Sequence, residues 1–181
     1  MFLLILGLVL WSGAHFMKRI APDARAQLGD RGKAVLGVAI LLSVVLMVLG
    51  YRSAPFIEVW TPPAFLTHLN NLLMILAFYL YAASGAKTAI TRKIRHPQLT
   101  AVKTWAVAHL LVNGDLASII LFGGLLAWAV VSVILINRAQ RDWQRPAPVP
   151  AKKEITAIVA TLVVVVIVML IHNWLGVQPW G

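Results

Sequence analysis

Long apolar runs separated by short polar segments make up most of the chain. Five of these runs are close to the roughly 17–25 residues that a helix needs to span the hydrocarbon core of a bilayer, although the first is slightly short. They are Phe2 to Met17, Ala34 to Tyr51, Ala64 to Ala83, Leu116 to Ile136 and Ile155 to Trp174. The pattern predicts an all-α, polytopic integral membrane protein built as a helical bundle.

The positions of the basic residues predict a sixth crossing. Fifteen of the 16 Lys and Arg residues lie in three segments, Lys18 to Lys33, Lys87 to Lys103 and Arg138 to Lys153. Basic segments between apolar helices are retained in the cytoplasm, so an even number of crossings must separate the last two segments. We expect about six transmembrane helices with both termini outside the cytoplasm. The alternative is a re-entrant half-helix.

The extra helix is expected to form one arm of a hairpin. It would run from about Leu99 to Asn113, turn at Asn113-Gly114-Asp115 and return through Leu116 to Ile136. Asn and Gly tolerate the positive φ of a tight turn, and Asp115 is suited to cap the following helix. The first arm is only about 22 Å long at 1.5 Å per residue. It spans the membrane only if the bilayer thins locally or other helices shield its end.

Composition narrows the protein class further. The chain is 60% hydrophobic and 12% charged, with a mean hydropathy of +0.84, which is far from a soluble domain. The net charge of +10 does not indicate nucleic-acid binding, because no soluble domain presents it. The absence of cysteine excludes disulfides, thiolate catalysis and iron–sulfur ligation. We interpret Met1 to Phe16 as a retained helix and expect one transmembrane domain over residues 1–181.

Several other residues have ordinary interpretations. Six tryptophans lie mostly near predicted helix ends, and most of them are expected to anchor the chain at the membrane interface, namely Trp11, Trp60, Trp128, Trp143, Trp174 and Trp180. The proline-rich run from Arg145 to Pro150 is interpreted as a stiff spacer. Arg92, Lys93 and Arg95 are interpreted as solvated charges that face lipid headgroups.

The topology sorts the five histidines by depth. His15 lies three residues before Lys18, about 5 Å inside the cytoplasmic boundary, and His109 lies six residues beyond Lys103, about 9 Å inside it. His68 and His172 fall toward the opposite side, where a wet interfacial position is the simpler interpretation. His96 belongs to the basic cytoplasmic loop.

Two imidazoles at similar depth on different helices are suited to hold a b-type haem by axial ligation. Trp11 shares a helix face with His15, while Trp105 and Asn113 share one with His109. These five residues are the candidate cofactor site, with His15 and His109 as ligands of the haem iron. The alternatives are interfacial histidines, interhelical hydrogen-bond partners, or another metal held by the same imidazoles.

The stretch from Arg95 to Asp115 resembles the signature of the NnrU family of bacterial membrane proteins. The sequence there reads RHPQLTAVKTWAVAHLLVNGD. The histidine that closes the first helix and the order of hydrophobic blocks also fit, so the resemblance covers essentially the whole chain. It implies a multi-pass protein of the bacterial inner membrane and an association with nitrite and nitric oxide metabolism in denitrification.

The resemblance also implies a cofactor. The 15-cis-ζ-carotene isomerase is similar to NnrU and is a b-haem membrane enzyme with histidine ligands, which correspond on the motif to His15 and His109. More distantly, Arg95-His96-Pro97 is similar to a motif of isoprenylcysteine carboxyl methyltransferases, which bind S-adenosylmethionine. Their acidic C-terminal segment is absent after the last helix, where Leu175 to Gly181 remain.

Three hypotheses follow. The first is a haem b protein with a redox-linked or isomerase-like role on a hydrophobic small molecule or nitric oxide; iron with two histidine ligands has no open position, so one ligand would leave on reduction. Asn113 or His96 would then stabilise the released imidazole. The second is a non-catalytic accessory factor that assists respiratory enzymes of denitrification. The third is an S-adenosylmethionine-binding, methyltransferase-like enzyme.

Overall fold

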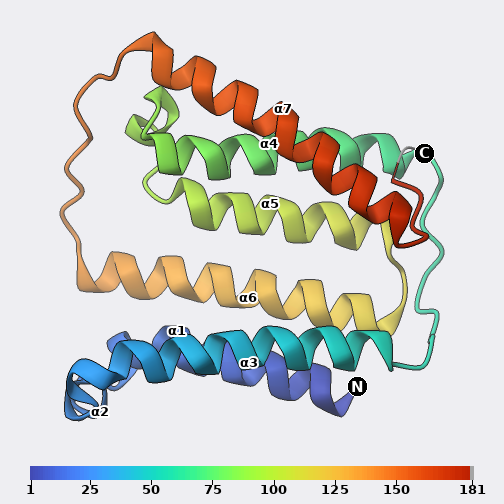
Figure 1. The fold of residues 1–181 in the computed structure, drawn as a ribbon, viewed down its shortest axis with the longest axis horizontal. Coiled ribbons are helices and arrows are strands. Elements are labelled where there is room, and N and C mark those ends of the chain that lie inside the picture. The colour runs from blue at the N-terminus through green and yellow to red at the C-terminus, as the bar shows by residue number, and fades with distance from the viewer. Residues whose placement is uncertain (180–181) are drawn as a thin grey trace. The chain divides into compact units, whose positions relative to one another are not determined.

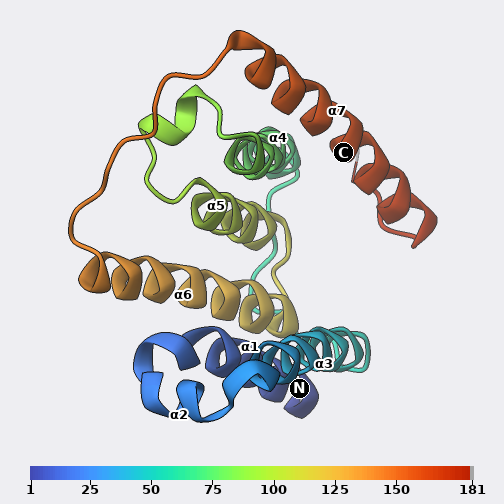
Figure 2. The same cartoon turned by 60° about the vertical axis from the view of Figure 1, so that its left-hand side comes forward.

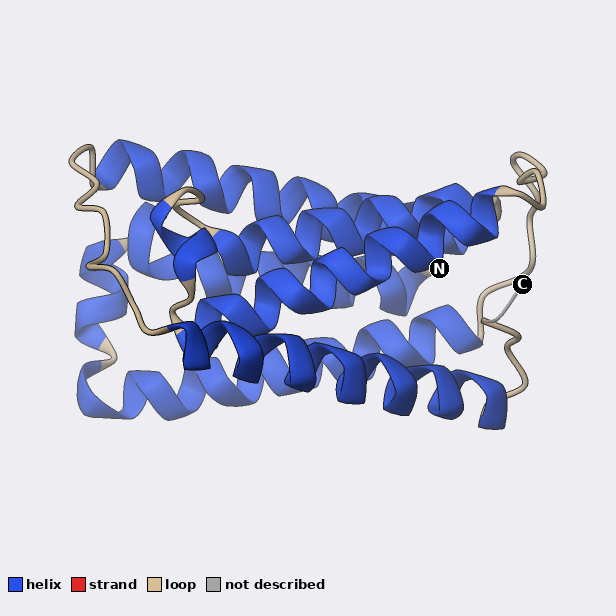
Figure 3. Cartoon of the chain, turned by 90° about the horizontal axis from the view of Figure 1, so that it is seen from above, coloured by secondary structure: helices blue, strands red, loops and turns tan. Residues whose placement is uncertain are grey.

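The structure is a computed structural model that describes residues 1–179, and helices are the regular elements throughout this range (Figure 1, Figure 3). Their order is α1 (Phe2–Ile20), α2 (Pro22–Gln27), η1 (Gly29–Arg31), α3 (Gly32–Arg52), α4 (Leu66–Ala86), η2 (Ala89–Arg92), α5 (Pro97–Val112), α6 (Leu116–Ala139) and α7 (Ala151–Trp174). All six predicted helices are present. The short α2, which begins at Pro22 in the first basic segment, was not predicted.

Five helices in the described range are long and apolar enough to cross a membrane: α1, α3, α4, α6 and α7. Large hydrophobic side chains remain exposed along them, for example Val38, Leu41 and Val163, as lipid contact requires. The all-α membrane fold is therefore confirmed. Helix α5 has 16 residues, about 24 Å at 1.5 Å per residue, so its full crossing stays a prediction.

The chain divides into two compact units. Unit 1 consists of Met1–Trp60 and Gly114–Ala139 and contains α1, α3 and α6. Unit 2 consists of Thr61–Asn113 and the described residues from Gln140 onward, and contains α4, α5 and α7. The expectation of a single domain stays a prediction.

In unit 1, α1 and α3 pack closely through small residues. A Cβ atom on Gly7 would lie 2.8 Å from the Ser43 carbonyl oxygen, and one on Gly50 would collide with the Leu4 backbone nitrogen. The earlier residue of α1, Leu4, meets the later residue of α3, Gly50, and the later residue of α1, Gly7, meets the earlier residue Ser43. Helices α1 and α3 are therefore antiparallel. Close approach of this kind increases van der Waals contact where lipid removes the hydrophobic driving force.

Helix α6 packs along α1 in the same direction. A Cβ atom on Gly124 would lie 2.8 Å from Leu8 Cδ1, and further along the two helices Trp11 contacts Trp128. At the other end of α6, Asp115 caps the helix as predicted, because its Oδ1 accepts a hydrogen bond of 2.9 Å from the Ser118 backbone N–H.

A side-chain network joins the end of α3 to the start of α6. Ser118 is fully buried and lies 2.5 Å from Asp115 Oδ2 and 2.8 Å from the Tyr51 hydroxyl. A carboxylate only accepts, so Ser118 donates its single proton to Asp115. Tyr51 must therefore be the donor to Ser118, which satisfies all three groups.

The turn before α6 differs from the predicted tight turn. Asn113 is extended, with φ −122° and ψ 109°, so the expectation of positive φ there was wrong. The reason is pairing with the loop that follows α3: the Val59 and Trp60 N–H groups donate to the Gly114 carbonyl at 2.8 and 3.1 Å, and the Leu116 N–H donates to the Ile57 carbonyl at 2.8 Å. Extended backbone is the conformation that such pairing needs.

In unit 2, α4 and α7 pack antiparallel and α5 lies beside α4 (Figure 1, Figure 2). Near one end of α4, the Tyr79 hydroxyl donates to the Glu154 carboxylate at the start of α7. Near the other end, Asn71 Nδ2 donates to the Pro179 carbonyl at 3.0 Å. The Ala89 N–H also donates to Glu154, at 3.2 Å, so η2 is tied to α7.

The close contact of α1 with α3 makes a testable prediction. We expect Gly50→Ala to destabilise the protein by about 1–3 kcal/mol, because the added methyl meets backbone that has no free rotamer to move. Thermal unfolding in detergent measures the effect. Gly37→Ala on the same helix is the control, since its Cβ meets nothing within 4 Å. Equal melting temperatures for the two variants would contradict the packing.

Candidate functional site

Unit 1 places His15 against two tryptophans. The ring centroids of Trp11 and His15 lie 4.2 Å apart, those of His15 and Trp128 4.9 Å apart, and those of Trp11 and Trp128 5.3 Å apart. Both contacts of Trp128 are edge-to-face, a favourable geometry for aromatic rings. We call these three residues the Trp-His-Trp cluster.

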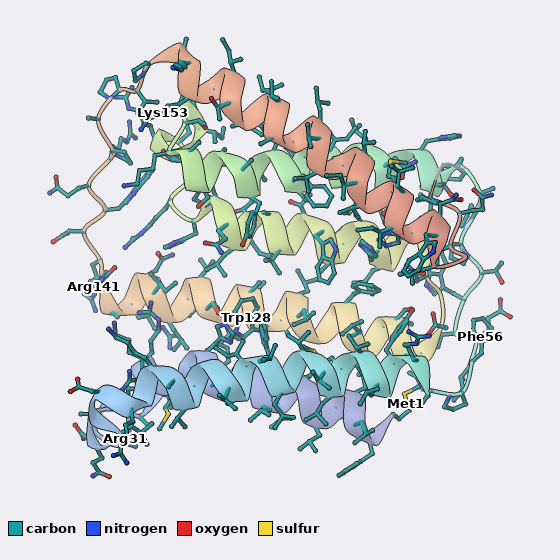
Figure 4. All side chains as sticks on the ribbon, viewed as in Figure 1. Met1, Arg31, Phe56, Trp128, Arg141 and Lys153 are labelled. Carbon is teal, nitrogen blue, oxygen red and sulfur yellow. The ribbon has the colours of Figure 1, made fainter. Side chains whose placement is uncertain are left out.

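Trp128 is the cluster member that the sequence did not single out. It was expected to be an interfacial anchor, but it lies near the middle of α6, on the side of the helix toward α1 (Figure 4). Its ring packs against Trp11 and His15 inside unit 1, a contact that the anchor interpretation did not include. Trp180, another expected anchor, lies outside the described residues.

The backbone selects the tautomer of His15. Its Nδ1 lies 2.8 Å from the Trp11 carbonyl oxygen one turn earlier. A carbonyl only accepts, so Nδ1 must carry the proton and Nε2 keeps its lone pair in the neutral ring. A histidine that ligates a metal usually has its other ring nitrogen oriented by such a bond.

Unit 2 contains the other predicted site residues. The Trp105 and His109 rings lie 5.1 Å apart, and His109 Nδ1 lies 3.0 Å from the Trp105 carbonyl, so its tautomer is the same as that of His15. Asn113 Nδ2 donates to the His109 carbonyl at 2.8 Å. The Asn113 side chain therefore holds the backbone of His109 rather than its imidazole.

Helix α5 places His109 far from its first residue. The helix begins at Pro97, so His109 lies 12 residues, about 18 Å, along it, while its depth from the membrane boundary stays a prediction. His109 and His172 are close enough to interact electrostatically, and His172 has the same backbone bond, to Val168, at 2.8 Å. The structure thus associates His109 with a histidine that was assigned to the interface, whereas His15 belongs to unit 1.

The remaining histidines stand apart from these contacts. His68 is exposed near the start of α4. His96 precedes α5, where its carbonyl accepts hydrogen bonds from the Thr100 N–H and hydroxyl, both at 2.9 Å. Across residues 1–179, no three His, Asp or Glu side chains are grouped to hold a metal ion. The imidazoles instead present single donor atoms, and this donor set fits axial ligation of a haem.

The surroundings of His15 also fit such a group. Lys18 and Arg19 follow one turn later on α1, and their positive charge would suit the propionates of a porphyrin. The indole N–H groups of Trp11 and Trp128 are buried and meet no acceptor among the described residues.

The basic loop before α5 contacts the linker between α6 and α7. Arg92 Nε donates to the Pro146 carbonyl at 3.0 Å, and Arg95 donates to the carbonyls of Gln140 and Arg141. Figure 4 labels Arg141 at the start of this linker. These hydrogen bonds are exposed to solvent, so the arginines contact the linker in addition to facing water. The linker is held in place as well as being a spacer.

Comparison with known proteins gives one match. A family profile described as NnrU protein matches residues 3–179. No curated protein and no solved structure matches the chain.

The arginine contacts predict how the linker responds to mutation. In the double variant Arg92→Gln/Arg95→Gln we expect limited trypsin digestion at Arg141 and Arg145 to be several-fold faster, because charged hydrogen bonds to the linker are lost. Lys93→Gln removes a charge from the same loop and serves as the control. Unchanged cleavage in the double variant would show that the arginines do not restrain the linker.

Proposed function

The chain belongs to the NnrU family of membrane proteins, which is associated with denitrification and nitric oxide metabolism, and we propose that it binds haem b. In this proposal His15 and His109 are the axial ligands, and the bound haem serves a redox-linked or isomerase-like role on a hydrophobic small molecule. The observation that carries the proposal is the pair of helix histidines, each beside a tryptophan and each with Nδ1 bound to a backbone carbonyl.

The chemistry of this chain supports that assignment in three ways. The Nδ1 bonds leave Nε2 as the ligating nitrogen and fix the orientation of each ring. Trp11, Trp105 and Trp128 supply flat apolar surfaces next to the imidazoles. The chain offers neither thiolates nor a three-residue cluster of metal ligands within its described part. When bound, haem would supply a redox-active iron in an apolar environment.

An optical spectrum tests the proposal. Protein purified in detergent from haem-replete cells is expected to show a Soret band that shifts on reduction with dithionite. We expect His15→Ala and His109→Ala each to lower the haem content about ten-fold or more, since loss of one axial ligand removes a major part of the binding energy. His68→Ala, at an exposed position, is the control and should keep the wild-type spectrum.

Two outcomes would redirect the assignment. Loss of haem in His172→Ala with retention in His15→Ala would make His172 the partner of His109, which belongs to the same unit. Absence of any chromophore, together with a stable co-purified respiratory protein, would favour the accessory role instead. A Soret band that none of the histidine variants changes would contradict the assignment of His15 and His109 as ligands.

We also propose that the protein lies in the bacterial inner membrane with both termini on the periplasmic side. The three basic segments support this orientation, because one of them follows α1, one precedes α5 and one follows α6. Six crossings, α5 included, are needed for the proposed sidedness.

Single introduced cysteines measure the orientation directly, because the chain has none of its own. In intact spheroplasts we expect a membrane-impermeant maleimide to label Glu58→Cys, and to label Lys93→Cys only after lysis. The reverse pattern would invert the topology. Three proposed crossings, α4, α5 and α6, separate Glu58 from Arg141, so we expect cysteines at these two positions to be labelled from opposite sides. Labelling from the same side would remove one crossing.

A further inference from the structure

Two buried donors in the Trp-His-Trp cluster have no acceptor in the described part of the chain. They are the Nε1–H groups of Trp11 and Trp128, and the two rings contact each other as well as His15. An indole N–H only donates, and leaving it buried without an acceptor costs free energy. Two such groups in one cluster call for an explanation, because buried polar groups in native proteins are nearly always paired.

Contacts inside the cluster do not supply that explanation. His15 Nδ1 is itself a donor, to the Trp11 carbonyl. The edge-to-face packing of Trp128 brings ring edges against ring faces, and an N–H over a ring face is a weak, second-order interaction. A ligand that carries an acceptor group accounts for both donors at once.

The charges of the three long helices of unit 1 favour an anionic acceptor, while the acidic residues of this unit, Asp23, Asp30, Glu58 and Asp115, lie outside those helices. Helices α1, α3 and α6 contain no Asp or Glu, whereas Lys18 and Arg19 lie three and four residues after His15, on its face of α1. A carboxylate provides two acceptor oxygens for the two N–H groups and balances the neighbouring positive charge. Charge-assisted hydrogen bonds of this type are also the stronger ones.

We infer that Trp11 and Trp128 form a carboxylate-binding site beside His15, in which both indole N–H groups donate to the carboxylate of a hydrophobic ligand. Two ligands share this chemistry, a porphyrin through its propionates and a long-chain fatty acid through its head group. The porphyrin case rests on the proposed haem function. The fatty-acid case does not.

The experiment observes the two N–H groups directly. Full-length protein labelled with ¹⁵N at the tryptophan indoles is prepared in detergent micelles, and its indole resonances are assigned with Trp11→Phe and Trp128→Phe. The ligands are dodecanoate and iron-free protoporphyrin IX, which does not require axial histidines. Methyl dodecanoate and protoporphyrin dimethyl ester are the matched controls that lack the carboxylate charge.

We expect at least one acid to move both indole N–H resonances downfield, and the esters to leave them in place. Each Trp→Phe substitution should weaken that acid's binding about ten-fold, while Trp174→Phe, at a residue that is 83% exposed, should not. A response to protoporphyrin alone identifies a propionate, and a response to dodecanoate identifies a fatty-acid head group; both support the inference.

Other results overturn it separately from the haem proposal. If neither acid moves the two resonances, or acids and esters act alike, the site does not bind carboxylates even if a Soret band is present. If dodecanoate binds through both N–H groups but purified protein shows no Soret band, the haem proposal fails and the inference stands. The wild-type titration remains decisive if a Trp→Phe variant does not fold.

Discussion

Main-chain polar groups in an apolar environment have to find partners within the protein, because lipid offers none, and much of this structure follows from that constraint. It makes helices the regular elements of the described chain. It also accounts for the extended turn before α6, whose backbone groups are paired with the loop after α3. Neighbouring loops thus supply hydrogen-bond partners for backbone groups that lie outside the helices.

The same constraint shapes the candidate site. His15 and His109 each use Nδ1 to bind the carbonyl one turn earlier, which settles the tautomer and leaves Nε2 as the nitrogen that would bind iron in the proposed haem site. His172 makes the same bond, so this bond by itself does not distinguish the proposed ligands from other histidines. The neighbouring side chains distinguish His15, and in unit 1 these are Trp11 and Trp128.

Packing of small residues sets where those neighbours lie. The missing side chains at Gly7 and Gly50 let α1 approach α3, and Gly124 accommodates Leu8 where α6 meets α1. Further along the same pair of helices, Trp11 meets Trp128. The positions of the rings around His15 therefore depend on glycines that have no functional side chain but allow the helices to approach closely.

Much of this architecture could be predicted from the sequence, because lipid exposure imposes apolar runs of a narrow range of lengths. The six main helices, the Asp115 cap and the family resemblance were all predicted from local pattern. The contact of Trp128 with His15 was not, because it joins residues 113 positions apart through the packing of α1 and α6. The extended conformation of Asn113 and the arginine contacts of the linker also required tertiary partners. Local pattern determines which segments enter the bilayer, whereas helix packing decides which side chains meet there, since that depends on the rotation and register of each helix against its neighbours.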